Sequence, residues 1–155
     1  MVRVFPSFLV IAFCALVTGC DHSPTTPSPG SPARYDGQWS GATFQRMTIA
    51  FSVSSDQKVT AISVGYRFDN CAGEKTFTNL NQDIGYASTP PIGSPRGPST
   101  ARDPAFYYAS APFTQPDHTQ IYGSFTSSTT ANGYVVFGDH PGCGSAGGIW
   151  NAVKR

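Results

Sequence analysis

The feature that most constrains the fold is a strict alternation of apolar and polar residues. In the segment 47–54 the apolar side chains fall on every second position: Met47, Ile49, Phe51 and Val53. Residues two apart lie on the same face of a β-strand, whereas a helix brings residues three and four apart together. The segment 58–68 alternates in the same way after a short run of turn residues. The two segments predict an antiparallel hairpin with one buried face.

One of these segments changes phase within its length. Val59 and Ala61 share one phase and Ile62 begins the other, so we expect a β-bulge near Ala61. Composition supports strands over helices, because only 12% of the residues are charged and Glu74 is the single glutamate. Long surface helices are usually rich in Glu and Lys. The net charge of +1, without a clustered basic face, argues against a nucleic-acid partner.

Short strand patterns recur through residues 34–155, which we expect to form one domain. Further strands are predicted at 35–44, 75–80, 106–110, 121–126, 134–137 and 148–155. The predicted connections are a long proline-rich loop at 86–104, a turn at 127–133 with Asn132-Gly133 as its strongest signal, and a Gly-rich loop at 138–148. About eight short strands predict an all-β, antiparallel β-sandwich, and a small closed β-barrel is the alternative. Trp39 and Trp150, on the first and last strands, are expected in the core.

The first 33 residues have the pattern of an export signal followed by a tether. A positive start at Arg3 precedes the apolar segment 4–17, which is short for a membrane span. The segment ends in Val17-Thr18-Gly19-Cys20, which resembles a bacterial lipobox. That resemblance implies that residues 1–19 form a signal peptide and that Cys20 is lipidated. Residues 20–33 are rich in Pro, Ser and Thr and predict an extended tether.

The lipobox resemblance also implies a location. Two or three acyl chains, palmitate among them, would anchor Cys20 durably in a membrane, since one chain alone holds only marginally. We therefore expect a lipoprotein of the bacterial cell envelope that faces the periplasm or the exterior. Removing the signal peptide removes Arg3 and leaves nine basic and nine acidic residues, because the full chain has ten and nine.

The cysteine count predicts a disulfide. Cys14 lies in the signal peptide and Cys20 carries the lipid, which leaves Cys71 and Cys143 in an oxidising compartment. The alternative is a metal site that uses both cysteines and His140. Neither a CxxC nor an HxxxH spacing supports it, so we expect neither a metal nor a cofactor.

Framework residues carry two resemblances. The segments Trp39-Ser-Gly41 and Thr130-Ala-Asn-Gly133, the two cysteines and the terminal Trp150-Asn-Ala152 resemble uncharacterised secreted or lipoprotein β-domains of bacteria. This resemblance implies the fold and no particular activity. Gly37-Gln38-Trp39 also resembles the GxW motif of lipocalins. The second resemblance implies a barrel that carries a small apolar ligand.

Catalytic motifs are sparse. A single glutamate does not supply the paired carboxylates of glycoside hydrolysis, and the chain has no G-x-S-x-G nucleophile elbow. His118 is expected in an exposed turn. We therefore predict that the protein is not an enzyme. A small hydrolase with a Ser–His–Asp arrangement, using His118 or His140, remains the third hypothesis.

Four tyrosines indicate a binding module. Tyr107, Tyr108, Tyr122 and Tyr134 lie in the second half of the domain, on predicted strands. About half of the residues on a strand face outward, and exposed aromatic rings on a sheet stack on sugar rings. The sequence thus favours a non-catalytic binding or structural β-module with a glycan or protein ligand. The lipocalin-like carrier is the alternative.

Overall fold

The computed structural model describes residues 34–68, 70–86 and 103–155. The predicted signal peptide, Cys20 and the tether lie outside these ranges, as does nearly all of the predicted 86–104 loop. The described part of the chain contains no helix with the length and apolar character of a membrane span.

Regular structure in the described residues consists of β-strands, which confirms the all-β prediction. Eight strands have six or more residues, and two have two residues each. The strands are β1 (Gly37–Thr43), β2 (Thr48–Val53), β3 (Lys58–Phe68), β4 (Cys71–Phe77), β5 (Gln82–Asp83), β6 (Gly85–Tyr86), β7 (Pro104–Ala109), β8 (Thr119–Phe125), β9 (Thr130–His140) and β10 (Gly144–Lys154).

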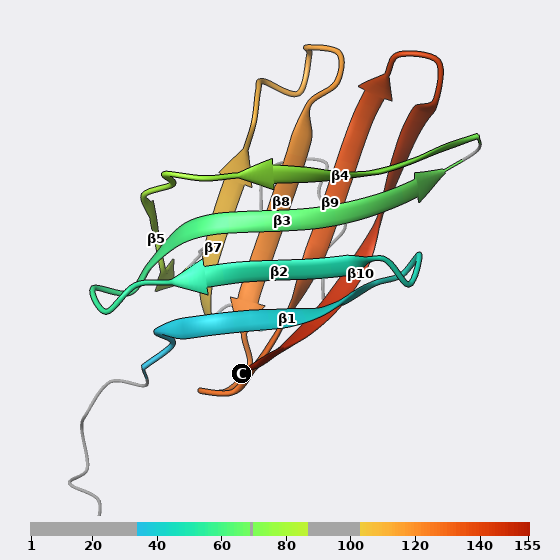
Figure 1. The fold of residues 1–155 in the computed structure, drawn as a ribbon. Helices are drawn as coiled ribbons and strands as arrows, with labels where there is room; N and C mark the ends of the chain where they lie inside the picture. The colour runs from blue at the N-terminus through green and yellow to red at the C-terminus, as the bar shows by residue number, and fades with distance from the viewer. Residues whose placement is uncertain (1–33, 69, 87–102) are drawn as a thin grey trace, which may run out of the picture. The chain divides into compact units, whose positions relative to one another are not determined.

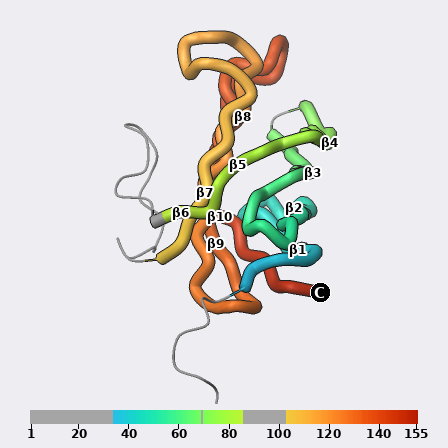
Figure 2. The backbone as a smooth tube through the Cα atoms, turned by 90° about the vertical axis from the view of Figure 1, so that its left-hand side faces the viewer, coloured from blue at the N-terminus to red at the C-terminus, as the bar shows by residue number. Residues whose placement is uncertain are grey.

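The strands form one antiparallel sheet that curls into a half-barrel. Its order is β4-β3-β2-β1-β10-β9-β8-β7-β6, and β5 also pairs with β3. The first and last strands are neighbours, with Trp39 opposite Lys154. Figures 1 and 2 show that the half made of β1 to β4 lies across the half made of β7 to β10. Strands β4 and β6 are the two ends of this order. The curled sheet is consistent with a sandwich or a barrel-like fold.

Aromatic side chains from both halves fill the space between them. Phe51 of β2 lies 5.5 Å from Trp39, 5.8 Å from Trp150 and 6.1 Å from Phe125, measured between ring centroids. Trp39 and Trp150 are 1% and 0% exposed, so both are core residues, as predicted. Burying one such side chain stabilises the fold by about 1.5–3 kcal/mol. The curl of the sheet is therefore held by a continuous apolar core.

The predicted bulge is confirmed. Ser52 pairs with Ala61 and Val53 pairs with Val59, so Thr60 is an extra residue on β3. The extra residue shifts the phase of the strand, and Val59 and Ile62 consequently both point into the core.

Three local predictions are wrong in their boundaries. The turn predicted at 127–133 is present but ends earlier, because the Thr126 amide donates to the carbonyl of Thr130 while Asn132 and Gly133 lie inside β9. The Gly-rich segment 138–148 is mostly strand and belongs to the ends of β9 and β10. Strand β4 begins at Cys71, whereas the sequence pattern places it at 75–80. Pairing with neighbouring strands overrides local turn and glycine preferences at these positions.

Candidate functional site

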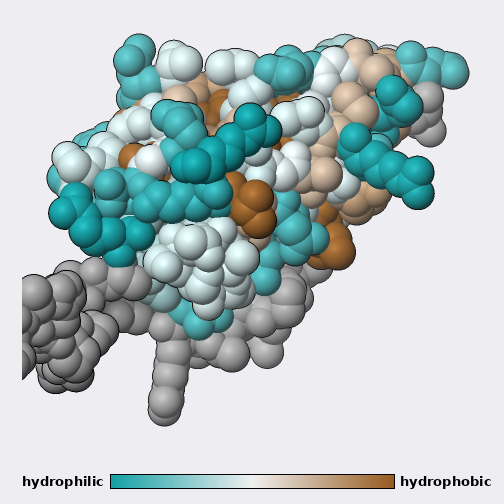
Figure 3. All heavy atoms as spheres, turned by 60° about the horizontal axis from the view of Figure 1, so that its bottom comes forward, coloured by the Kyte–Doolittle hydropathy of each residue, from teal (hydrophilic) through white to brown (hydrophobic). Residues whose placement is uncertain are grey.

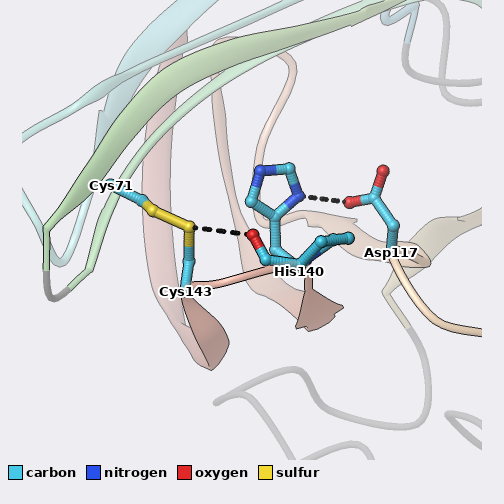
Figure 4. Close-up of a disulfide and its surroundings, with 5 residues drawn as sticks. Cys71, Asp117, His140 and Cys143 are labelled. Carbon is cyan, nitrogen blue, oxygen red and sulfur yellow. Dashed lines mark hydrogen bonds and ion pairs between the residues drawn. A yellow bond between two sulfur atoms is a disulfide. The ribbon is translucent and has the colours of Figure 1, made fainter.

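The predicted disulfide joins the two halves of the sheet. Cys71 begins β4 and Cys143 lies in the turn between β9 and β10, and their Cα atoms are 5.8 Å apart (Figure 4). This separation is usual for a disulfide. Both sulfurs are bonded to each other, so the alternative in which they ligate a metal as thiolates does not apply. In the described residues, no three His, Cys, Asp or Glu side chains are grouped to hold a metal ion.

A charged cluster lies on the same side of the half-barrel as the disulfide. Asp117 Oδ1 accepts a hydrogen bond from Lys75 Nζ at 2.5 Å. It accepts another from His140 Nδ1 at 2.6 Å (Figure 4). The Lys75 hydrogen bond, and next the His140 hydrogen bond, lower the pKa of Asp117. Further along β4, Phe77 packs against Tyr108 with ring centroids 4.7 Å apart. Side chains thus link β4 to the opposite half of the sheet at several points.

The two described histidines have different surroundings. His140 is bonded to Asp117, while the nearby Ser145 hydroxyl donates to Asp139 at 2.9 Å. No hydrogen bond joins His140 to a serine in the described ranges, so a Ser–His–Asp relay is not assembled there. His118 is not the exposed turn residue that the sequence predicts, because it is 4% exposed.

His118 is buried because its neighbours enclose the ring. Phe113 packs on it with centroids 4.9 Å apart, and its Nδ1 lies 2.8 Å from the carbonyl oxygen of Gln115. The ring also lies over Gly138, where an added Cβ would fall 1.7 Å from the His118 Cε1 atom. The side chain is thus part of the packing beside β8 and β9.

The candidate site is the face of β7 to β10, with part of β1, that points away from the core. We call it the outer face. Directly opposed residues on neighbouring strands point to the same side of a sheet, so the pairing defines its members. They are Ala105, Tyr107, Ala109, Gln120, Tyr122, Ser124, Thr130, Asn132, Tyr134, Val136, Gly147, Ile149, Asn151, Val153, Ser40 and Ala42.

Three of the four predicted tyrosines form a row on the outer face. Tyr107 lies opposite Tyr122, Tyr122 lies opposite Tyr134, and Tyr134 lies opposite Ile149. Tyr107 and Tyr134 are half-buried, whereas Tyr122 in the middle is 6% exposed. Burial raises the pKa of the Tyr107 hydroxyl. The rings at the two ends of the tyrosine row therefore keep part of their surface in water.

Tyr108 does not belong to this row. Its side chain points to the other side of β7, where it packs against Phe77 and the core. Neighbouring residues on a strand face opposite sides, so Tyr107 and Tyr108 cannot both contribute to one surface.

The outer face is uncharged. None of its members is Asp, Glu, Lys or Arg, whereas the opposite half of the sheet presents Arg67 and Glu74 from β3 and β4. At its edge the Arg155 guanidinium donates to the Ser40 hydroxyl at 2.5 Å. Exposed apolar side chains include Ile149 and Val153, at 53% and 55%. Figure 3, a view of the end where β1 and the C-terminus lie, shows hydrophobic colour as separate spots among hydrophilic and neutral residues.

Next to the tyrosine row lies a row of hydroxyl and amide groups that the sequence alone does not indicate. Ser124 lies opposite Asn132, and Asn132 lies opposite Asn151. The sequence predicts a turn at Asn132 and a strand at Asn151, and it predicts no binding role for either side chain. Only the register of β8, β9 and β10 brings these residues together, so no local sequence signal identifies them.

Comparisons with protein-family models, with curated proteins and with solved structures found no match for this chain.

Proposed function

We propose that the protein is a membrane-anchored lipoprotein of the bacterial cell envelope and a non-catalytic module that binds a neutral glycan on its outer face. The observation that carries this proposal is the alignment of Tyr107, Tyr122 and Tyr134 on three adjacent strands. Tyr107 and Tyr134, the two partly exposed rings of this row, can stack on the apolar faces of sugar rings, while Tyr122 between them is buried. The uncharged setting favours a ligand without charge, because no ion has to lose its hydration there.

The other hypotheses find less support. A lipocalin-like carrier needs an apolar space inside the sheet, and the rings of Phe51, Phe125 and Trp150 occupy the interior between the two halves. A hydrolase needs a nucleophile next to an acid–base pair, and the His140–Asp117 pair has no bonded serine in the described part of the chain. A protein ligand on the outer face is an outcome that the following experiment separates from a glycan.

The experiment measures binding of the purified protein to a panel of immobilised neutral oligosaccharides. We expect binding to at least one of them, and Tyr134→Ala should weaken it about tenfold, in line with the contribution of an aromatic contact. Arg67→Ala is the control, because Arg67 is exposed on the opposite half of the sheet. Failure to bind any oligosaccharide, or equal loss in both variants, contradicts the proposal. Capture of a protein with no oligosaccharide binding would favour a protein ligand.

A further inference from the structure

A pocket lies on the outer face beside the tyrosine row. It has a volume of about 260 Å³ and is formed by β1, β9, β10 and the turn that precedes β9. This is slightly below the usual range for sites that hold a drug-sized ligand, about 300–1,000 Å³. The lining side chains that matter here are those of Ser40, Thr130, Asn132, Asn151 and Val153. The pocket therefore suits one part of a larger ligand, such as a single substituted sugar ring.

Two carboxamides in this pocket have hydrogen-bonding capacity that the protein does not use. Asn132 and Asn151 lie directly opposite each other on β9 and β10. Within the described residues neither side chain makes a hydrogen bond, and Asn132 Oδ1 is buried without a partner. The other polar groups are engaged, since Thr126 and Thr130 bond each other at 2.8 Å and Ser40 accepts from Arg155.

An unpaired buried amide oxygen costs free energy, which a ligand relieves if it pairs with that group. A carboxamide carries an acceptor on one side and two donors on the other, and a 180° rotation exchanges them. The Asn132 group can therefore present either its oxygen or its nitrogen to the pocket. Two such groups side by side can accept a hydrogen bond from one ligand atom and donate one to another.

We infer that this pocket recognises the 2-acetamido group of an N-acetylhexosamine within the bound glycan. The inference rests on the proposed glycan-binding function and names the class of sugar. An acetamido group has one N–H donor and one C=O acceptor on opposite edges, and one asparagine can meet each of them. Its methyl group is apolar and fits against Val153, whose exposed side chain lines the same pocket on the outer face.

The same chemistry discriminates against closely related sugars. A ring with a hydroxyl in place of the acetamido group offers neither the amide pair nor the methyl, so part of the Asn132–Asn151 capacity stays unused. The lining residues include no charged side chain, and Arg155 reaches the edge through Ser40. Selectivity should therefore depend on the two amides.

The test compares two β-linked tetrasaccharides, tetra-N-acetylchitotetraose and cellotetraose, which differ only in the substituent at C2 of each ring. Titration calorimetry on the purified full-length protein should give an affinity at least about tenfold higher for the acetamido sugar. Asn151→Ala, an exposed position, should reduce that preference to near unity, and Asn132→Ala should do the same. Arg67→Ala on the opposite half should keep it. Thermal melting of each variant identifies any loss of folding.

The possible outcomes separate this inference from the proposed function. Equal affinity for the two tetrasaccharides overturns the inference and leaves glycan binding in place. A preference that persists in both asparagine variants also overturns it, because the pocket then is not the selective site. Absence of binding to either sugar, with binding to other oligosaccharides in the panel, overturns the inference alone. Absence of binding to every oligosaccharide overturns both proposals.

Discussion

The Nζ atom of Lys75, near the middle of β4, lies 2.5 Å from Oδ1 of Asp117, in the connection before β8. The two residues are 42 positions apart in the chain and belong to opposite halves of the curled sheet. The ion pair and the Cys71–Cys143 disulfide connect β4 to the segment before β8 and to the turn between β9 and β10, with which it shares no backbone pairing. The half-barrel is thus held together by side chains where the backbone ladder ends.

Replacing Asp117 with asparagine should lower stability in a pH-dependent way. The pKa of Asp117 is lowered in the folded protein relative to its usual value of 3.8. Its contribution is therefore fully present above about pH 5 and disappears as the pH falls through the folded pKa. In urea unfolding at neutral pH, the free energy of unfolding of the wild-type protein should exceed that of the variant by at most about 1 kcal/mol, because the pair is partly exposed. This difference should shrink below about pH 4. A gap that widens on acidification would contradict this assignment.

Removing the disulfide should destabilise the domain substantially. The loop that it closes spans 72 residues, and in the chain-entropy model such a link contributes about 4 kcal/mol. Cys71→Ser combined with Cys143→Ser should therefore unfold at much lower denaturant concentration than the oxidised protein. The reduced wild-type protein is the matched control and should resemble the double variant. Equal stability of the oxidised and reduced forms would show that the core alone holds the two halves together.

Truncating Phe51 should be among the most damaging core substitutions. Its ring packs against Trp39, Trp150, Phe106 and Phe125, and its side chain is 2% exposed. Phe51→Ala should cost about 3–5 kcal/mol through lost burial and the cavity left behind. Ile149→Ala, at a 53% exposed position, should cost less than about 1 kcal/mol in the same denaturation experiment. Similar losses in the two variants would be inconsistent with the core described above.

A methyl group at Gly133 should disturb the packing of β8, β9 and β10. An added Cβ would fall 1.9 Å from the carbonyl oxygen of Tyr122 and 2.5 Å from the Trp150 ring. Gly133→Ala should therefore lower stability by about 1–3 kcal/mol, as overpacking does. At Gly85 an added Cβ meets nothing within 4 Å, so Gly85→Ala should leave the midpoint of thermal unfolding nearly unchanged. A well-folded, fully stable Gly133→Ala variant would argue against this register of β9.

The proposed lipidation at Cys20 predicts a simple fractionation result. In a bacterial host that processes lipoproteins, the wild-type chain should sediment with membranes and lose residues 1–19. Mass spectrometry should then detect acyl chains on Cys20. Cys20→Ser should prevent the modification and release most of the protein from the membrane fraction. An unmodified Cys20 in the wild-type chain, or cleavage at another bond, would refute the anchor.

Much of the strand content follows from local pattern. Met47 to Val53 alternate strictly. Residues 58–68 alternate with one change of phase, and the predicted bulge near Ala61 is present where that change is visible in the sequence. The disulfide is predicted because Cys71 and Cys143 remain once Cys14 is assigned to the expected signal peptide and Cys20 to the expected lipid. That prediction needs no knowledge of the distance between them. The turn predicted at 127–133 ends earlier than expected, because the Asn132-Gly133 preference is weaker than the pairing of β9 with two neighbouring strands.

The sequence by itself determined that the chain forms antiparallel strands, that two tryptophans are buried and that two cysteines pair. The tertiary structure alone decided that Tyr107, Tyr122 and Tyr134 share one face while Tyr108 faces the core. It also decided that Asn132 and Asn151 meet in one pocket, and that Lys75 reaches Asp117. The physical reason is that side-chain alternation is a local property of each strand, whereas register and curvature depend on contacts between strands distant in the chain.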